Sequence, residues 1–222
     1  SVARLVAAPL EVTAAHTSAT IYGYVRSTAA LSCRYRWGFA AGRGEPGVSM
    51  GIIPTNHGQT CLFAAVSTDF DAGSAADRRR AFARVIEESA PEIGARLSEA
   101  TLEGKLRFFP GMKGFVRQPY GDGWALVGDA GYMTDPITAH GITNALRDAD
   151  ILARTIGEGR SLADYQMTRD DLSLKFFEVS DRVASYDWDI PTVQQYHRIM
   201  SQEMNREEEA IVAAEATTAT AA

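Results

Sequence analysis

The sequence has few of the features that mark several large classes of protein. Its 222 residues include 2 cysteines and 4 histidines, and its formal net charge is −6. An acidic chain of this kind lacks the basic face expected of a nucleic-acid-binding protein. No apolar run approaches the roughly 20 residues that a membrane-spanning helix needs. We therefore expect a cytoplasmic protein with no nucleic-acid partner and no membrane span.

The residues that could form a disulfide or bind a metal are scattered. Cys33 and Cys61 both fall in strand-like runs without metal-like spacing. This favours buried free thiols in a reducing compartment over a bridge. The histidines lack the paired spacing of zinc-binding motifs, since they stand at His16, His57, His140 and His197. We predict no metal site.

Four strand-like runs precede the first helical pattern. Gly, Pro, Asn and Ser separate them, and they span residues 20–26, 31–40, 48–54 and 59–67. This spacing is typical of an antiparallel meander. A helix with an apolar side formed by Phe82, Val85 and Ile86 is expected next. We predict that the sheet packs on this helix, near residues 75–89.

One glycine-rich stretch matches the sequence pattern of a nucleotide-binding fingerprint. Gly42, Gly44 and Gly47 fit the pattern G-x-G-x-x-G, which in dinucleotide-binding proteins joins a strand to a helix. Here another strand-like run follows, and Pro46 among three glycines is typical of a hairpin turn. The context therefore favours a turn over a pyrophosphate site.

The most informative stretch lies between residues 124 and 156. A strand-like run at 124–127 is followed by Gly128 and Asp129, a compact loop, and a helix. The helix has apolar residues every three or four positions: Ile142, Ala145, Leu146, Ala149, Leu152, Ala153 and Ile156. A carboxylate and the free N–H groups of a helix N-terminus should then meet at the end of a strand. A lone Gly-Asp would be only a turn, with Asp129 an N-cap. The register of Pro136 and Gly141 with the helix favours a ligand site.

This stretch resembles the second FAD-binding motif of the flavoprotein aromatic hydroxylases and their relatives, which include flavin-dependent halogenases and geranylgeranyl-reductase-like oxidoreductases. The matching residues are Gly128, Asp129, Ala130, Pro136, Gly141, Arg147, Asp148 and Ala149. The resemblance implies that Asp129 holds a ribityl hydroxyl of FAD. It also implies that the backbone of Gly141 and Ile142 faces the pyrimidine edge of the flavin. Gly131-Tyr132 stands where Ala-His is common, which leaves the reaction subtype open.

The resemblance also implies an organisation for the chain. Residues 1–9 are similar to the stretch after the family's central Asp-Gly motif, so we expect the back half of a flavoprotein without its FAD-binding front half. The implied fold class is α/β, or α+β within this chain, with an antiparallel sheet and C-terminal helices. The expected parts are a connector at 1–19, a substrate-domain sheet with a helix at 20–118, the second FAD-binding motif at 119–160, and C-terminal helices at 161–222.

Candidate substrate and further cofactor residues follow from the same resemblance. In the family, a sheet of this kind roofs the substrate cavity, which makes candidates of Tyr22, Tyr24, Arg36 and Met50. The alternative is that the tyrosines cover solvent-facing sheet surface. Arg117, in a short strand-like run at 115–118, is a cofactor candidate, with surface pairing as its alternative.

The C-terminal part is expected to be helical. One long helix should use Leu162, Tyr165, Leu172, Phe176, Val179 and Val183, and the run 189–191 should break it. A second helix should use Val193, Tyr196, Met200, Met204 and Ile211. The small residues at 213–222 should fray unless a neighbour holds them.

The implied activity is that of a FAD-dependent monooxygenase acting on a small organic substrate, with NADPH or NADH as reductant. The flavin carries that chemistry, so no catalytic acid or base is named. Hydroxylase, halogenase, epoxidase and reductase all remain open. The competing class is a non-catalytic binding or interaction module that has kept the fold and lost FAD. An absent front half also implies a homo-oligomer, or pairing with the missing half.

Overall fold

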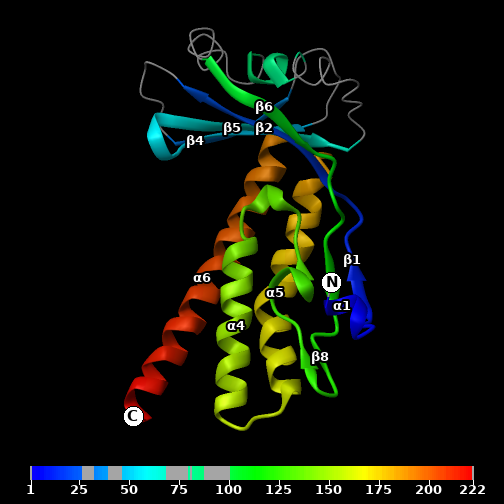
Figure 1. The fold of residues 1–222 in the computed structure, drawn as a ribbon, viewed down its shortest axis with the longest axis vertical. Coiled ribbons are helices and arrows are strands. Elements are labelled where there is room, and N and C mark those ends of the chain that lie inside the picture. The colour runs from blue at the N-terminus through cyan, green and yellow to red at the C-terminus, as the bar shows by residue number, and fades with distance from the viewer. Residues whose placement is uncertain are drawn as a thin grey trace. The chain divides into compact units, whose positions relative to one another are not determined.

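The computed structural model describes residues 2–26, 33–39, 47–68, 80, 82–87 and 101–221, with residues 34–39, 101 and 217–221 described by their backbone alone. The chain forms two compact units (Figure 1). The sheet unit comprises Thr17–Met112 and Ala184–Ile190, and the helical unit comprises Ser1–His16, Lys113–Val183 and Pro191–Ala222. The four-part division expected from the sequence stays a prediction, and each unit is described by itself below.

The sheet unit is built on five antiparallel strands. They are β2 (Ser18–Arg26), β3 (Arg34–Phe39), β4 (Gly47–Pro54), β5 (Gln59–Ser67) and β6 (Thr101–Phe109), with the one-turn η1 (Asn56–Gly58) joining β4 to β5. The antiparallel sheet predicted for residues 20–67 is confirmed. The strand order is β3-β4-β5-β2-β6, so the predicted meander is correct only for β3, β4 and β5. Strand β2 lies between β5 and β6 because its apolar face, which includes Ile21 and Val25, is buried more fully in the middle of the sheet than at an edge.

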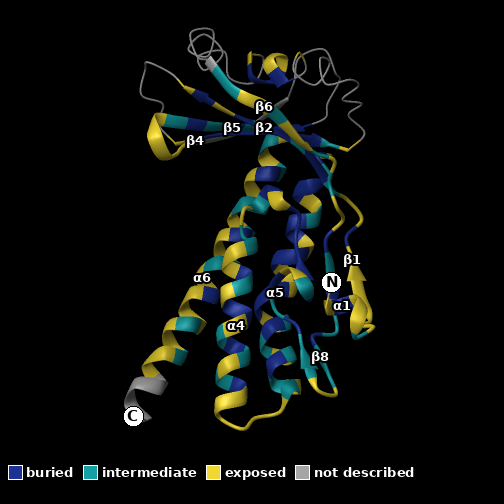
Figure 2. Cartoon of the chain, in the orientation of Figure 1, coloured by how far each residue is buried: buried dark blue, intermediate teal, exposed yellow. Residues whose placement is uncertain are grey.

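One face of this sheet forms the core of the unit. Ile21, Met50 and Leu62 lie on it and are each 5% exposed or less. The helical residues 82–87 add their apolar side to this cluster, which confirms the predicted packing of helix on sheet for the described part of that helix. Figure 2 shows the central strands largely in the colour of buried residues.

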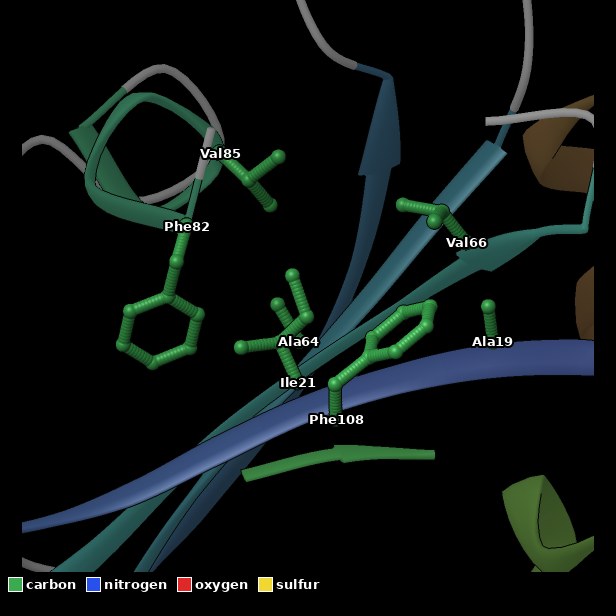
Figure 3. A pocket seen from close by; sticks show the side chains of 7 residues that line it. All are labelled: Ala19, Ile21, Ala64, Val66, Phe82, Val85 and Phe108. Atoms are coloured by element: carbon green, nitrogen blue, oxygen red, sulfur yellow. The ribbon is translucent and has the colours of Figure 1, made fainter. Parts of the chain in front are cut away.

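A shallow pocket remains where the helix meets the sheet. Figure 3 shows Phe82 and Val85 of the helix on one side and Ile21, Ala64 and Phe108 of the sheet on the other. Every residue that lines it is apolar. Ligand sites combine apolar walls with a few polar groups that orient the ligand, so this pocket is best explained as imperfect packing of the core.

The structure describes the two strands that flank the glycine-rich stretch. Gly47 begins β4 and pairs with Phe39 of β3 across an antiparallel ladder. A strand follows Gly47, and not the helix that a dinucleotide-binding fingerprint requires. Residues 40–46, where the turn is predicted, lie outside the described residues.

The helical unit combines three long helices with short strands. Its helices are α1 (Val2–Leu5), α4 (Gly141–Gly157), α5 (Leu162–Ala184) and α6 (Ile190–Ala221). A three-stranded antiparallel sheet has the order β1 (Leu10–Thr13), β7 (Phe115–Arg117), β10 (Tyr132–Met133). Of the strand predicted at 124–127, only β9 (Trp124–Ala125) forms, and it pairs with β8 (Tyr120–Gly121) in a hairpin. The predicted short strand near 115–118 is confirmed as β7.

Helix α4 buries a different face from the one expected. Ile142, Leu146 and Ile156 of the expected apolar stripe are 81%, 68% and 63% exposed. The buried residues of this helix are instead Asn144, Arg147, Asp148, Ile151 and Thr155. The prediction was wrong because it counted only hydrophobicity. Charged groups enter the interior when they pair and hydrogen-bond with one another, and those of α4 do so.

The two C-terminal helices are present with adjusted boundaries. The hydroxyl of Ser161 accepts a hydrogen bond from the Ala163 amide, which caps α5. The break between α5 and α6 lies at residues 185–189, where Tyr186 has a φ of 57°. Pro191 does not belong to the break but lies in the first turn of α6, where the missing N–H has no cost. The backbone of α6 is helical through Ala221.

Two smaller expectations concern thiols and hydropathy. Both cysteines are free, but Cys33 is exposed and precedes β3, so the expectation of a buried thiol was wrong there. Cys61 in β5 is half-buried, and burial raises the pKa of its thiol. Among the helices described above, none combines the length and the apolar content of a bilayer-crossing segment.

The buried face of α4 can be tested by paired truncations in this chain. Ile151 packs with Tyr165 and Leu172, so Ile151→Ala should lower the free energy of unfolding by about 2–4 kcal/mol. Leu146→Ala, on the exposed side of the same helix, should cost less than about 0.5 kcal/mol. Urea unfolding measures both. Equal losses would show that the stripe containing Leu146 is covered and that the assigned face is incorrect.

Candidate functional site

The site is built around the turn η2 (Gly128–Ala130), which follows extended backbone at Val127. Gly128 has a φ of 52°, which L side chains rarely adopt. A Cβ at this position would lie 2.7 Å from the Cβ of Ala145 in α4. Only glycine therefore lets the turn approach the helix this closely.

A hydrogen bond joins the same turn to α4. The Gly128 amide donates to Oδ2 of Asp148 at 3.1 Å. The other oxygen of that carboxylate, Oδ1, accepts from Nη2 and Nε of Arg147 at 2.7 and 3.1 Å. Both side chains are 1% exposed. A buried, charge-assisted contact thus fixes the position of the Gly-Asp turn on the helix.

Asp129, the next residue of the turn, takes no part in these contacts. It is exposed, and among the described residues no group donates a hydrogen bond to its carboxylate. Its Oδ1 lies 3.9 Å from the position that a Cβ on Gly141 would take. The N-cap of α4 is His140 and not Asp129. The alternative that Asp129 serves only as an N-cap of this helix is therefore excluded.

The amino end of α4 supplies hydrogen-bond donors beside that carboxylate. No side chain of the described residues caps the helix, and its first backbone bond runs from the Asn144 amide to the His140 carbonyl. The preceding N–H groups, at residues 141–143, keep the partial positive charge of a helix N-terminus. An acceptor on Asp129 and donors on α4 thus lie side by side, as expected from the sequence.

The loop between the turn and the helix is held by its own hydrogen bonds. Asp135 is 4% exposed and its Oδ1 accepts from the Ile137 amide at 3.0 Å. This caps η3 (Pro136–Thr138), and Ala139 then turns the chain into α4 with a φ of 52°. These local hydrogen bonds, together with the pairing of β10 with β7, hold the loop that joins Asp129 to the helix start.

A group of buried charges lies behind α4. Arg147 donates to Oδ1 of Asn144 at 3.2 Å and to Oε1 of Glu207 at 3.4 Å. Nε2 of His140 lies 2.7 Å from Oε2 of Glu207. Burial alone would lower the pKa of Arg147, but the neighbouring carboxylates, Asp148 first, outweigh it and leave that pKa raised. Arg147 therefore stays charged inside the protein.

The residues predicted to bind the cofactor fall into two groups. Asp129, Gly141 and Ile142 lie together at the exposed side of the turn and helix start. Gly128 is the buried residue of the turn, and Ala130 packs against the apolar cluster that contains Leu126. Pro136 is exposed at the start of η3. All six remain candidates, with the first three best placed to touch a ligand.

The predicted substrate residues do not share one surface. Tyr22 and Tyr24 lie on one face of the five-stranded sheet, with their rings edge to face at 6.5 Å. Met50 lies on the other face and is 1% exposed in the core. Arg36 pairs with Met50 across the ladder and so belongs to that second face, while its side chain lies outside the described residues. The structure thus brings the two tyrosines together on one face and pairs the backbones of Arg36 and Met50 in neighbouring strands.

Arg117 has contacts that suit its alternative role. Its Nη1 donates to the Ala8 carbonyl at 2.8 Å, and its guanidinium lies 5.0 Å from the centre of the Phe115 ring. These contacts tie β7 to the segment that follows α1. They favour pairing within the fold over a cofactor contact.

Two residues of the site were not predicted from the sequence. His140 was considered only as one of four scattered histidines, and Glu207 was not considered at all. A signal for Glu207 was nevertheless present, because it stands three residues after Met204 and four before Ile211, in the apolar stripe of α6. Among the described residues, no group of histidine, cysteine and acidic side chains is arranged to hold a metal ion.

Comparison with known proteins shows which families this chain resembles. The family model for squalene epoxidase matches residues 79–186, just under half of the chain. The ubiquinone hydroxylase UbiM of Neisseria meningitidis serogroup C is 36% identical over 67 residues, which cover 30% of this chain and 14% of that protein. These matches confirm the resemblance to the C-terminal part of FAD-dependent monooxygenases and related oxidoreductases.

Solved structures agree on the fold. Halogenase PltM superimposes with a TM-score of 0.64 at 14% identity, over 98% of this chain and 50% of that one. The flavin-dependent brominase Bmp2 gives a TM-score of 0.62 at 16% identity, over 88% and 51% of the two chains. The predicted α/β fold class is confirmed. The chain spans about half the length of these two proteins and a smaller share of the hydroxylase. The family model and the hydroxylase lend no support to the non-catalytic alternative.

The close approach of the turn to α4 can be tested by alanine substitutions at two glycines, of which only one would place the new Cβ against the helix. Gly128 and Gly159 both have positive φ, but a Cβ would meet Ala145 only at Gly128 and nothing within 4 Å at Gly159. Gly159→Ala should therefore cost about 1 kcal/mol from backbone strain alone. Gly128→Ala should cost about 2–4 kcal/mol, because the turn must also move off the helix. Chemical denaturation measures both, and equal costs would contradict the assigned contact.

Proposed function

We propose that this chain is the back half of a FAD-dependent oxidoreductase, a monooxygenase that acts on a small organic substrate with NADPH or NADH as reductant. The observation that carries the proposal is the free carboxylate of Asp129 beside the uncapped amino end of α4 at Gly141. The sequence resemblance, the family match and the hydroxylase relative support it.

The chemistry of these groups fits one part of FAD. A carboxylate accepts hydrogen bonds from hydroxyls, which suits the ribityl chain. The N–H groups of a helix start donate to carbonyl oxygens and stabilise partial negative charge, which suits the pyrimidine edge of the flavin. Gly141 carries no side chain that would separate the two. Ile142, 81% exposed at the same place, offers an apolar surface to a ring system.

The role of the protein residues in this proposal is to bind and orient. FAD, when bound, supplies the transfer of electrons from the reduced nicotinamide and the activation of oxygen. Asp129 and the start of α4 fix the orientation of the flavin ring, and the Gly128–Asp148 bond fixes Asp129 in turn. We assign no acid or base among the described residues. Hydroxylation, halogenation, epoxidation and reduction remain alternative outcomes for the substrate.

The first test removes the carboxylate. Asp129→Ala in the complete protein should weaken FAD binding by roughly one to two decades, because a hydrogen bond to a charged group contributes about 1.5–3 kcal/mol. Asp122→Ala is the matched control, since Asp122 is exposed in the turn between β8 and β9. Fluorescence titration of the apoprotein with FAD measures both. Unchanged affinity in the Asp129 variant would reduce Asp129 to a turn residue.

The second test concerns the chain by itself. FAD enzymes of this kind hold the pyrophosphate on a glycine-rich loop between a strand and a helix. The only stretch with that pattern here leads into strand β4 at Gly47. We therefore expect these 222 residues alone to bind FAD more weakly than micromolar, and to become yellow only when a nucleotide-binding half is supplied. Visible absorption of the purified chain after gel filtration decides this. Stoichiometric, tightly held FAD would mean that the chain contains a pyrophosphate site of its own.

A further inference from the structure

Helix α6 has a buried acid in its packed face. Glu207 is 4% exposed, although most of its neighbours on this helix are polar and exposed. It continues the stripe of apolar residues formed by Val193, Met200, Met204 and Ile211. An apolar side chain would suit this position better, because a buried carboxylate is costly unless it is paired. Its presence therefore calls for a reason beyond packing.

The two partners of Glu207 are His140, the N-cap residue of α4, and Arg147 within that helix. Oε2 of Glu207 lies 2.7 Å from Nε2 of His140, the residue that immediately precedes the helix. Oε1 accepts from Nη1 of Arg147 at 3.4 Å, almost two turns further along. The ring of Phe176 lies 4.8 Å from the His140 ring, centre to centre, and packs against it. One carboxylate thus holds α4 at its amino end and near its middle.

The contacts continue from Arg147 to the Gly-Asp turn. Arg147 pairs with Asp148, and Asp148 accepts from the Gly128 amide. The side chains of Arg147, Asp148, Glu207 and His140 are only 1%, 1%, 5% and 11% exposed. Solvent therefore screens these contacts weakly. A continuous path of buried polar contacts runs from α6 to the backbone of Gly128, the residue next to Asp129.

We propose that Glu207 is a positioning residue for the flavin site, which holds the amino end of α4 through His140 and the Gly-Asp turn through Arg147. This inference rests on the proposed function, because it concerns the same site. Glu207 itself does not touch the ligand. Its role is to keep the N–H groups at residues 141–143 and the Asp129 carboxylate at the spacing that the flavin requires.

A role in stability alone predicts a different result from a role in positioning. Removing one partner of a buried ion pair is strongly destabilising because it leaves the other charge uncompensated, so the cost is smaller where that charge keeps a second partner. Arg147 would keep Asp148 and Asn144 as partners. Methionine at position 207 would also extend the stripe of Met200 and Met204. Glu207→Met should therefore keep most of the stability and lose the contact that anchors the start of α4.

The experiment compares variants of the complete protein in their affinity for FAD and in the visible spectrum of the bound flavin. Glu207→Met should weaken FAD binding by roughly tenfold, the effect of about 1.4 kcal/mol, and should shift the flavin absorption bands. Its apoprotein should unfold within a few degrees of the wild type. Glu207→Gln, which keeps hydrogen-bonding atoms for His140 and Arg147, should restore most of the affinity. Glu208→Met, at an exposed position of the same helix, is the matched control and should change nothing.

A second variant keeps the test decisive if Glu207→Met does not fold. His140→Leu breaks the same contact from the side of the site and should also weaken FAD binding by roughly tenfold. Where both singles fold, the double variant should be no weaker than either one, because the two residues act through their mutual contact. Additive losses would overturn the proposed path through His140.

The outcomes separate this inference from the proposed function. A wild-type complete protein that binds no FAD would overturn the proposed function. A wild type that binds FAD, with Glu207→Met or His140→Leu equal to the Glu208 control in affinity and spectrum, would overturn the positioning role alone. A loss of thermal stability with unchanged flavin affinity and spectrum would assign Glu207 to the fold only.

Discussion

The hydrogen bond from the Gly128 amide to the Asp148 carboxylate is the contact on which the arrangement of the site depends. It joins two segments that are 20 positions apart and places the Gly-Asp turn directly on α4. Such proximity is possible only because Gly128 has no side chain to meet Ala145. With the turn fixed, the loop that follows has one way to reach the start of α4. The spacing between Asp129 and Gly141 is therefore a consequence of a contact made elsewhere.

That contact also explains the unusual orientation of α4. A buried Asp148 needs a cation, and Arg147, its neighbour in sequence, enters the interior with it. Arg147 in turn requires further acceptors, which Asn144 and Glu207 supply. Because these polar residues occupy the buried face of α4, Leu146 and the other apolar positions lie on its exposed face. The exposed apolar stripe of α4 is thus the result of an electrostatic requirement at the turn and not of weak amphipathicity.

Because the buried face of α4 depends on charged partners far away in the chain, it could not be predicted from local sequence patterns. The strands β2 to β5, the turn at Gly128 and the start of α4 follow from local patterns, because turn residues and alternation act over a few positions. The place of β2 beside β6 did not follow, since the polar composition of β6 hides its role as an edge strand. The buried face of α4 did not follow either, because pairing partners such as Glu207 lie 60 positions away from Arg147. Hydrophobic periodicity places Glu207 on the packed side of α6, but it does not indicate the residue with which Glu207 pairs.

The same reasoning separates the groups that hold the fold from the groups that remain for a ligand. Asp135, Asp148 and Glu207 are buried acids that are each committed to a partner within the protein. Asp129 precedes all three in sequence, but it accepts nothing from the described residues and is exposed. The backbone of Asp129 is fixed by the bond from Gly128 to Asp148, while its carboxylate stays available beside helix N–H groups that no described side chain caps. Among these four acids, the one that the fold does not use is therefore the strongest candidate for a functional residue.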